Sequence, residues 1–148
     1  MRKVAIVTGA TRGIGKACAL SLAQQGFDVV VTGRTQKEGE GTATLPFSRE
    51  GRQVAVPGSL ETTVQAVQAL GREALPVRMD VLDRSSMDTV IAQTLEHWDR
   101  IDVLVNNAGM QFRAPLEDFP LEKWRELMRV NVESAFIVGK AVATGMIA

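Results

Sequence analysis

Two patterns of apolar and polar residues alternate along the chain. Runs of mostly apolar, often β-branched residues predict strands buried on both faces at residues 3–8, 27–32, 74–79 and 101–106. Apolar residues at intervals of three and four predict helices over residues 14–25, 60–70, 87–98 and 121–142. This unbroken alternation specifies an α/β fold with an open, parallel, doubly wound sheet.

Residues with known preferences for helix ends mark several boundaries. Ser59 is expected to cap the second helix, and Gly71 to end it. Ser85 and Asp88 predict a capping box at the start of the third helix. Residues 39–57 mix glycines and prolines with scattered charges, so we expect most of this segment to be loop.

Composition excludes several classes of protein. The 148 residues suit one domain, and 45% hydrophobic with 23% charged residues is typical of a globular protein rather than a disordered one. A net charge of zero argues against a nucleic-acid or membrane-surface protein. One cysteine excludes an intramolecular disulfide, and no residue cluster predicts a metal site. With no apolar run near 18 residues and no signal-peptide pattern, we expect a cytoplasmic protein.

The loop after the first predicted strand reads Thr-Gly-Ala-Thr-Arg-Gly-Ile-Gly over residues 8–15. Its glycines would let a dinucleotide pyrophosphate reach the backbone N–H groups at the helix N-terminus. The alternative is a glycine-rich turn that binds nothing. The spacing departs from G-x-G-x-x-G but resembles the cofactor loop of the short-chain dehydrogenase/reductase family. That resemblance implies cofactor contacts from Gly9, Thr11, Arg12, Gly13, Ile14 and Gly15.

The end of the second predicted strand indicates which cofactor is bound. An NAD-binding unit places an acidic residue there, whereas this chain has Arg34. A guanidinium can bind the 2′-phosphate of NADP through paired hydrogen bonds, and Arg12 would approach the same phosphate from the other side. The alternative is two solvated surface arginines. We therefore expect NADP rather than NAD.

Two later motifs extend the resemblance over essentially the whole chain. In the family, an aspartate at the position of Asp80 binds the adenine amino group, and the next residue, here Val81, packs on the ring. The Asn-Asn-Ala-Gly sequence that includes Asn107, Ala108 and Gly109 would form the floor of the cofactor cleft. The length of segment 39–57 resembles the hydroxysteroid dehydrogenase-like branch.

The family uses an asparagine, a serine, a tyrosine and a lysine for proton transfer. Asn131 matches the asparagine, which holds a water in the proton relay, and it could also satisfy backbone groups. The chain has no tyrosine, and the serine and Tyr-x-x-x-Lys segments would follow Ala148. His97 and Cys18 are expected to be a surface and a core residue rather than substitutes.

The resemblance therefore implies an NADP-dependent oxidoreductase that moves hydride between nicotinamide and a carbonyl or alcohol carbon. Residues 1–148 would form its Rossmann domain, incomplete at the C-terminus, with the fourth strand left as a sheet edge. We expect this chain to be inactive alone and the complete enzyme to be a homo-oligomer acting on a small molecule. The alternative is a catalytically silent nucleotide-binding module or partner subunit.

Overall fold

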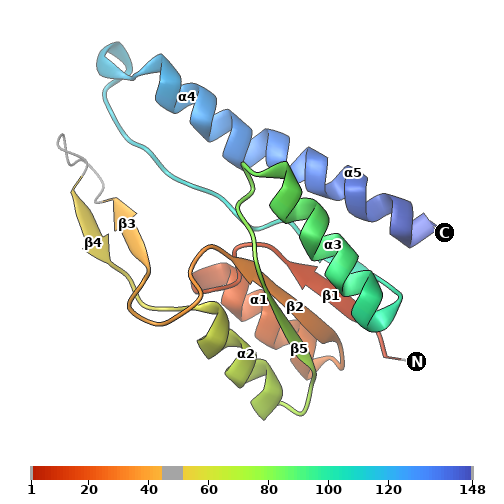
Figure 1. Ribbon diagram of the computed structural model, residues 1–148. Helices are drawn as coiled ribbons and strands as arrows, with labels where there is room; N and C mark the ends of the chain where they lie inside the picture. Colours follow the sequence, from red (N-terminus) through yellow and green to blue (C-terminus); the bar gives the residue numbers. More distant parts are fainter. Residues whose placement is uncertain (1, 45–51, 148) are drawn as a thin grey trace.

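The computed structural model describes residues 2–44 and 52–147 (Figure 1). A parallel sheet lies at its centre, formed by β1 (Val4–Val7), β2 (Asp28–Gly33), β5 (Ala74–Arg78) and β6 (Val103–Val105). Their order is β5-β2-β1-β6, so the chain runs outward from β1 on one side and returns to its other side. This order confirms the doubly wound fold and leaves β6 at an edge of the sheet.

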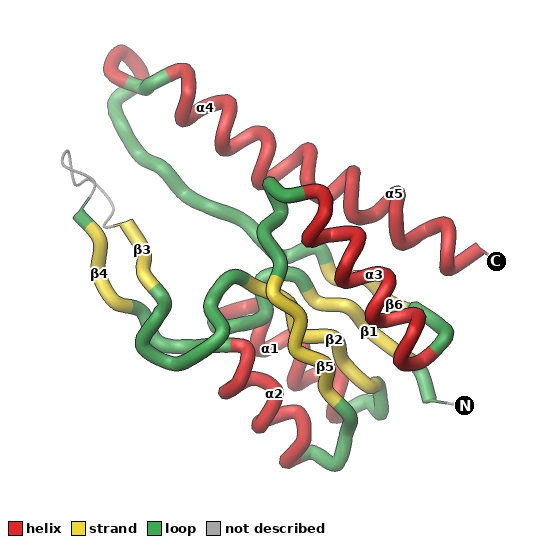
Figure 2. Tube along the Cα trace, viewed as in Figure 1, coloured by secondary structure: helices red, strands yellow, loops and turns green. Residues whose placement is uncertain are grey.

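Helices cover both faces of the sheet (Figures 1 and 2). On one face, α1 (Gly13–Gln24) and α2 (Leu60–Ala69) pack against alternate residues of β1 and β2. On the other face, α3 (Arg84–Trp98) and α5 (Ser134–Ile147) pack against the intervening residues. Every residue of β1 and β2 is buried, which explains the run of valines in β2 and the apolar residues throughout β1.

The predicted loop at residues 39–57 contains a small ribbon. Strands β3 (Thr42–Thr44) and β4 (Gln53–Ala55) pair in antiparallel fashion, and we call this pair the β3–β4 ribbon. Residues 45–51 of the segment lie outside the described part of the chain. Strands of three residues are too short for an alternating pattern to stand out, so the prediction of mostly loop missed them.

The start of α3 differs from its prediction. Asp83 is the N-cap, and its carboxylate accepts hydrogen bonds from the backbone N–H of Ser85 at 3.0 Å and from the Ser85 hydroxyl at 2.8 Å. Asp88 instead pairs with Arg84 on the helix surface. The capping box predicted at Ser85 and Asp88 is therefore wrong, because Asp83 is the N-cap and its carboxylate already accepts from the backbone N–H of Ser85. Ser59 caps α2 as predicted, in a reciprocal pair with Thr62.

The predicted final helix is present and continues to Ile147. It consists of α4 (Leu121–Met128), a π-helical turn at Arg129–Glu133 and then α5, and a short 3₁₀ turn at Leu116–Asp118 precedes it. Within the described residues, this is the one helix whose length and composition would allow it to cross a membrane, and 22% of its most apolar window is buried. Its buried residues Val138 and Val142 belong to the core against α3, while α4 extends beyond the sheet (Figure 1).

Candidate nucleotide-binding site

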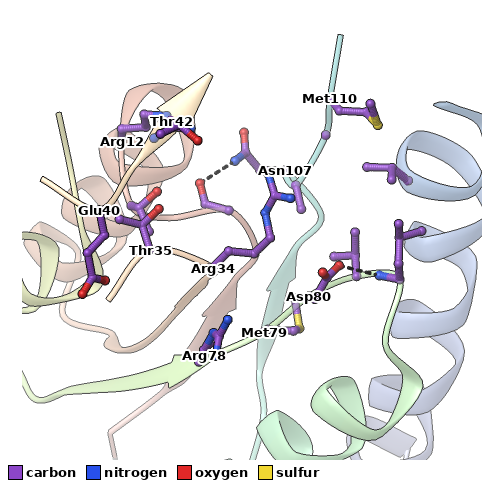
Figure 3. Close-up of a pocket in the computed structure, with 18 of the residues that line it drawn as sticks. Arg12, Arg34, Thr35, Glu40, Thr42, Arg78, Met79, Asp80, Asn107 and Met110 are labelled. Carbon is purple, nitrogen blue, oxygen red and sulfur yellow. Dashed lines mark hydrogen bonds between the residues drawn. The ribbon is translucent and has the colours of Figure 1, made fainter. Parts of the chain in front are cut away.

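The carboxyl ends of the four parallel strands meet at a cleft of about 550 Å³ (Figure 3). Its size is typical of a small-molecule site, and its position is where doubly wound sheets bind ligands. Most of the predicted cofactor-binding residues come together in its walls. These are Gly9, Thr11, Arg12, Arg34, Asp80, Val81, Asn107, Ala108 and Gly109.

Hydrogen bonds join the loop after β1 to the segment after β6. The Thr8 hydroxyl oxygen accepts from the backbone N–H groups of Asn107 and Ala108, both at 2.9 Å. The Asn107 side-chain amide donates to the carbonyls of Thr8 at 3.0 Å and Gly9 at 3.1 Å. The Asn107 side chain therefore holds the glycine-rich loop against the segment after β6.

Glycine is required at Gly13 and at Gly15 for different physical reasons. At Gly15, a Cβ would overlap the Gly9 carbonyl oxygen and lie 2.5 Å from the Asn107 amide nitrogen. At Gly13, φ is +54° and a Cβ would meet nothing within 4 Å. Gly15 is thus required by packing within the protein, whereas the space above Gly13 is open. Gly13, Gly15 and Ile14 lie outside the cleft lining, and Ile14 is 76% exposed.

The N-terminus of α1 has free hydrogen-bond donors. Its N-cap, Arg12, makes no side-chain capping bond, and no acidic residue lies in the first turn. By contrast, side-chain oxygens of Ser59 and Asp83 cap α2 and α3. Free N–H groups and the positive end of the helix dipole suit a pyrophosphate.

Asp80 is held in a fixed orientation at the opposite wall of the cleft. One of its carboxylate oxygens accepts a hydrogen bond from the backbone N–H of Leu82 at 2.9 Å. The Ser86 hydroxyl accepts from the Asp80 backbone N–H at 3.0 Å and donates to its carbonyl at 2.8 Å. The second carboxylate oxygen accepts no hydrogen bond from the described residues, and Asp80 lies beside the half-buried Val81.

The base of the β3–β4 ribbon packs on the glycine-rich loop. A Cβ at Gly41 would lie 3.1 Å from Nη1 of Arg12, and that nitrogen is buried without a hydrogen-bond partner in the described residues. Gly58, with φ of +104°, lies so close to the Thr11 carbonyl that a Cβ would overlap it. The Glu38 carboxylate accepts from the Gly58 backbone N–H at 2.9 Å. Arg12 therefore lines the cleft but lies partly beneath the ribbon.

Several lining residues were missed by sequence reasoning, namely Thr35, Glu40, Thr42, Arg78, Met110 and Glu126. Arg78 had a usable signal, because it is a charged residue between the buried Val77 and Met79 in an otherwise apolar run. Glu40 and Thr42 had no sequence signal, since only the fold of the β3–β4 ribbon brings them to the cleft.

Asn131 lies next to the cleft rather than in its lining. Its side-chain amide bonds the backbone of Met110, and its neighbour Val130 lines the cleft. Asn131 therefore forms hydrogen bonds with backbone groups, as expected. Its role in a proton relay stays a prediction. His97 is half exposed against Trp98 and Glu73, away from the cleft, and Cys18 packs against the core. No cluster suited to a metal ion occurs among residues 2–44 and 52–147.

Comparisons with known proteins identify relatives of this chain. The family model of the short chain dehydrogenases matches residues 3–58 and 46–148. Gluconate 5-dehydrogenase of Gluconobacter oxydans (strain 621H) is 37% identical over 143 residues, covering 97% of this chain and 48% of that protein. Hydroxysteroid dehydrogenase-like protein 2 of Bos taurus is 30% identical over 135 residues, covering 91% and 29%. The crystal structure of F189W actinorhodin polyketide ketoreductase with NADPH superposes with a TM-score of 0.77 at 30% identity, covering 98% and 48%.

These matches extend over nearly all of this chain but only part of each relative. The chain spans about half the length of the first curated relatives it matches. Similarity to a gluconate 5-dehydrogenase as well as to a hydroxysteroid dehydrogenase-like protein leaves the branch a prediction. The doubly wound sheet, the glycine-rich loop and the family model together lead to one conclusion: the chain belongs to the short-chain dehydrogenase/reductase family.

Proposed function

We propose that this chain binds NADP(H) in the cleft at the carboxyl ends of its strands. The observation that carries the proposal is the uncapped N-terminus of α1, which opens on a cleft whose other walls hold Arg34 and Asp80. The pyrophosphate would bind at the helix N-terminus, with Gly13 and Ile14 at the loop turn. Adenine would bind between Asp80 and Val81.

The preference for NADP rests on the charges at the end of β2. Arg34 is exposed and lines the cleft, and no carboxylate in the described residues forms an ion pair with it. A guanidinium at this place favours a 2′-phosphate, whereas NAD-specific sites place a carboxylate there. The related ketoreductase structure, which contains NADPH, is consistent with this preference.

We further propose that the whole protein is a cytoplasmic oxidoreductase that moves hydride between nicotinamide and a carbonyl or alcohol carbon of a small molecule. These 148 residues contain no tyrosine, so they cannot supply the tyrosine that exchanges a proton with substrate in this family. Asn131 would belong to its proton relay. A row of exposed apolar residues on α4, the π-helical turn and α5, at Trp124, Met128, Val132 and Phe136, suits contact between copies in a homo-oligomer.

Cofactor titration tests the binding proposal. The chain should bind NADPH more tightly than NADH, and Arg34→Asp should weaken NADPH binding by roughly tenfold or more, because a charge-assisted contact is worth about 1.5–3 kcal/mol. Arg2→Asp makes the same charge change at the other end of the strands and serves as the control. Equal affinities for both cofactors in the wild-type chain would exclude the NADP preference.

A second candidate is a catalytically silent nucleotide-binding module. An assay with NADPH and a panel of ketones and aldehydes separates the two. The 148-residue chain should show no turnover, and a polypeptide extended along its coding sequence through a Tyr-x-x-x-Lys segment should show it. Turnover by the 148 residues at the extended enzyme's rate would place the chemistry in residues we have not assigned.

A further inference from the structure

We propose that Arg78, the last residue of β5, is a second guanidinium of the 2′-phosphate subsite and helps determine the choice of cofactor. This inference rests on the proposed function and deepens it. Arg78 lines the cleft, is exposed, and belongs to a different strand from Arg34.

The register of the sheet places the two arginines next to each other. Arg78 is directly opposite Gly33 in the parallel ladder, and the backbone N–H of Met79 donates to the Gly33 carbonyl at 3.0 Å. Arg34 follows Gly33, so the side chains of Arg34 and Arg78 leave the backbone at the ends of two neighbouring strands. Neighbouring strands lie about 5 Å apart. Both side chains are long enough to reach one phosphate group between them.

The alternation of β5 sets the direction in which Arg78 leaves the sheet. Its neighbours Val77 and Met79 are 5% and 3% exposed and pack in the core against α3 and α5. Arg78 therefore points to the opposite face, where it lines the cleft together with Arg34, whose side chain extends toward Asn107 (Figure 3). On that face Gly33 has no side chain, and a Cβ there would lie 2.7 Å from Cγ2 of Thr11.

The acidic side chains of the cleft do not neutralise these two arginines. Among the described residues, no carboxylate of the lining forms an ion pair with Arg34 or Arg78. Glu40 accepts from the backbone N–H of Lys37 at 3.0 Å, Asp80 accepts from Leu82, and Glu126 pairs with Lys123 at 2.7 Å.

The two guanidinium groups are therefore unpaired within the described residues. Two unpaired positive charges at neighbouring strand ends repel each other, and a dianion between them removes that repulsion. At the other end of the strands, Arg72 and Arg100 are paired with Asp28 and Asp102. The 2′-phosphate of NADP supplies such a dianion, whereas NAD carries a neutral hydroxyl at that position.

Arg12 is less suited to be the second ligand. Its Nη1 atom is buried beneath Gly41, so part of the guanidinium cannot reach a ligand in this arrangement. Arg78 has no such cover. We therefore assign the phosphate chiefly to Arg34 and Arg78, with Arg12 at its margin.

Calorimetric titration of the 148-residue chain with four ligands tests this assignment. The ligands are NADPH, NADH, adenosine 2′,5′-bisphosphate and AMP, measured for the wild type, Arg78→Gln, Arg78→Lys and the control Arg2→Gln. Arg78→Gln should weaken NADPH and the bisphosphate about tenfold and leave NADH and AMP within about twofold. Arg78→Lys should keep part of the affinity, because it keeps the charge but loses the paired donors.

The outcomes separate the inference from the proposed function. A wild-type chain without preference for NADPH would overturn both. A wild-type preference that survives unchanged in Arg78→Gln would overturn the role of Arg78 alone. Equal weakening of all four ligands would also overturn it, since a residue that only supports the fold acts on every ligand. Thermal unfolding of each variant checks that the chain is folded, and Arg78→Lys provides the test if Arg78→Gln is not.

Discussion

The side-chain amide of Asn131 binds both polar backbone groups of Met110. Its oxygen accepts from the Met110 N–H at 2.9 Å, and its nitrogen donates to the Met110 carbonyl at 3.0 Å. Gly109 leaves room for this contact, because a Cβ there would lie 3.1 Å from the Asn131 oxygen. The π-helical turn that carries Asn131 is thus attached to the loop that lines the cleft.

Asn131→Asp should lower the free energy of unfolding by about 1–2 kcal/mol at pH 7. The carboxylate can still accept from the Met110 N–H, but it has no proton to donate and faces the Met110 carbonyl. Urea denaturation measures the change. Gln111→Glu makes the same amide-to-acid change at an exposed neighbouring residue. Equal losses in the two variants would show that added charge, not the lost contact, is responsible.

Gly15→Ala should destabilise the chain by about 1–3 kcal/mol, because the new methyl group overlaps the Gly9 carbonyl in a packed interior. Gly13→Ala is its matched control: the methyl group meets nothing, and only the left-handed backbone conformation opposes it, by about 1 kcal/mol. Thermal unfolding should therefore show a larger loss for Gly15→Ala. A Gly15→Ala variant as stable as Gly13→Ala would contradict the close approach at Gly9.

Asp80→Asn should weaken NADPH and NADH binding equally, by roughly tenfold. The amide oxygen can keep the bond to Leu82, but the amide nitrogen then faces the adenine amino group, where an acceptor is needed. Both cofactors carry adenine, so their ratio of affinities should stay constant, unlike the ratio in Arg34→Asp. Asp88→Asn, on the surface of α3, controls for the loss of a charge. A change confined to NADPH would indicate that Asp80 acts on the phosphate instead.

Asp102 should make stability depend on pH in the acid range. The hydrogen-bonded Arg100 guanidinium lowers the pKa of Asp102 below its ordinary value of 3.8; burial opposes this shift, and the Val4 N–H, at 2.7 Å, supports it. Because the pKa is lowered on folding, the unfolded chain binds more protons. The stabilisation is complete above the unfolded pKa and is lost as the pH falls through the folded one.

Wild-type protein should therefore unfold at higher urea than Asp102→Asn at pH 7, and the difference should shrink below about pH 3.8. Urea midpoints at pH 7, 5 and 3 provide the measurement. The exposed Asp118→Asn should show no such trend. A difference that stays constant from pH 7 to pH 3 would mean that the charge of Asp102 contributes nothing.

Elements with strong local signals were predicted from the sequence. The apolar runs of β1 and β2 and the Ser59 cap follow from burial on both faces and from a free helix end. The π-helical turn at Arg129–Glu133 was not predictable, because one extra residue in a turn leaves the apolar spacing almost unchanged.

The candidate site was predictable where topology alone brings residues together. Parallel strands end at one edge, so Arg34, Asp80 and Asn107 converge whatever the loops do. Arg78 was missed although its charge lies between two apolar residues, because the run was interpreted only as a strand buried on both faces. The sequence indicated that position 15 needs a glycine but not why. A glycine required by close packing within the protein looks the same in a sequence as one required by a bound ligand.

The hydrogen bond between Glu38 and Gly58, which are 20 residues apart, joins the two ends of segment 39–57 beside the glycine-rich loop. Once such a loop is closed at its base, each doubling of its length costs only about 0.6 kcal/mol of chain entropy. A change in the length of the segment between these two positions should therefore cost little chain entropy.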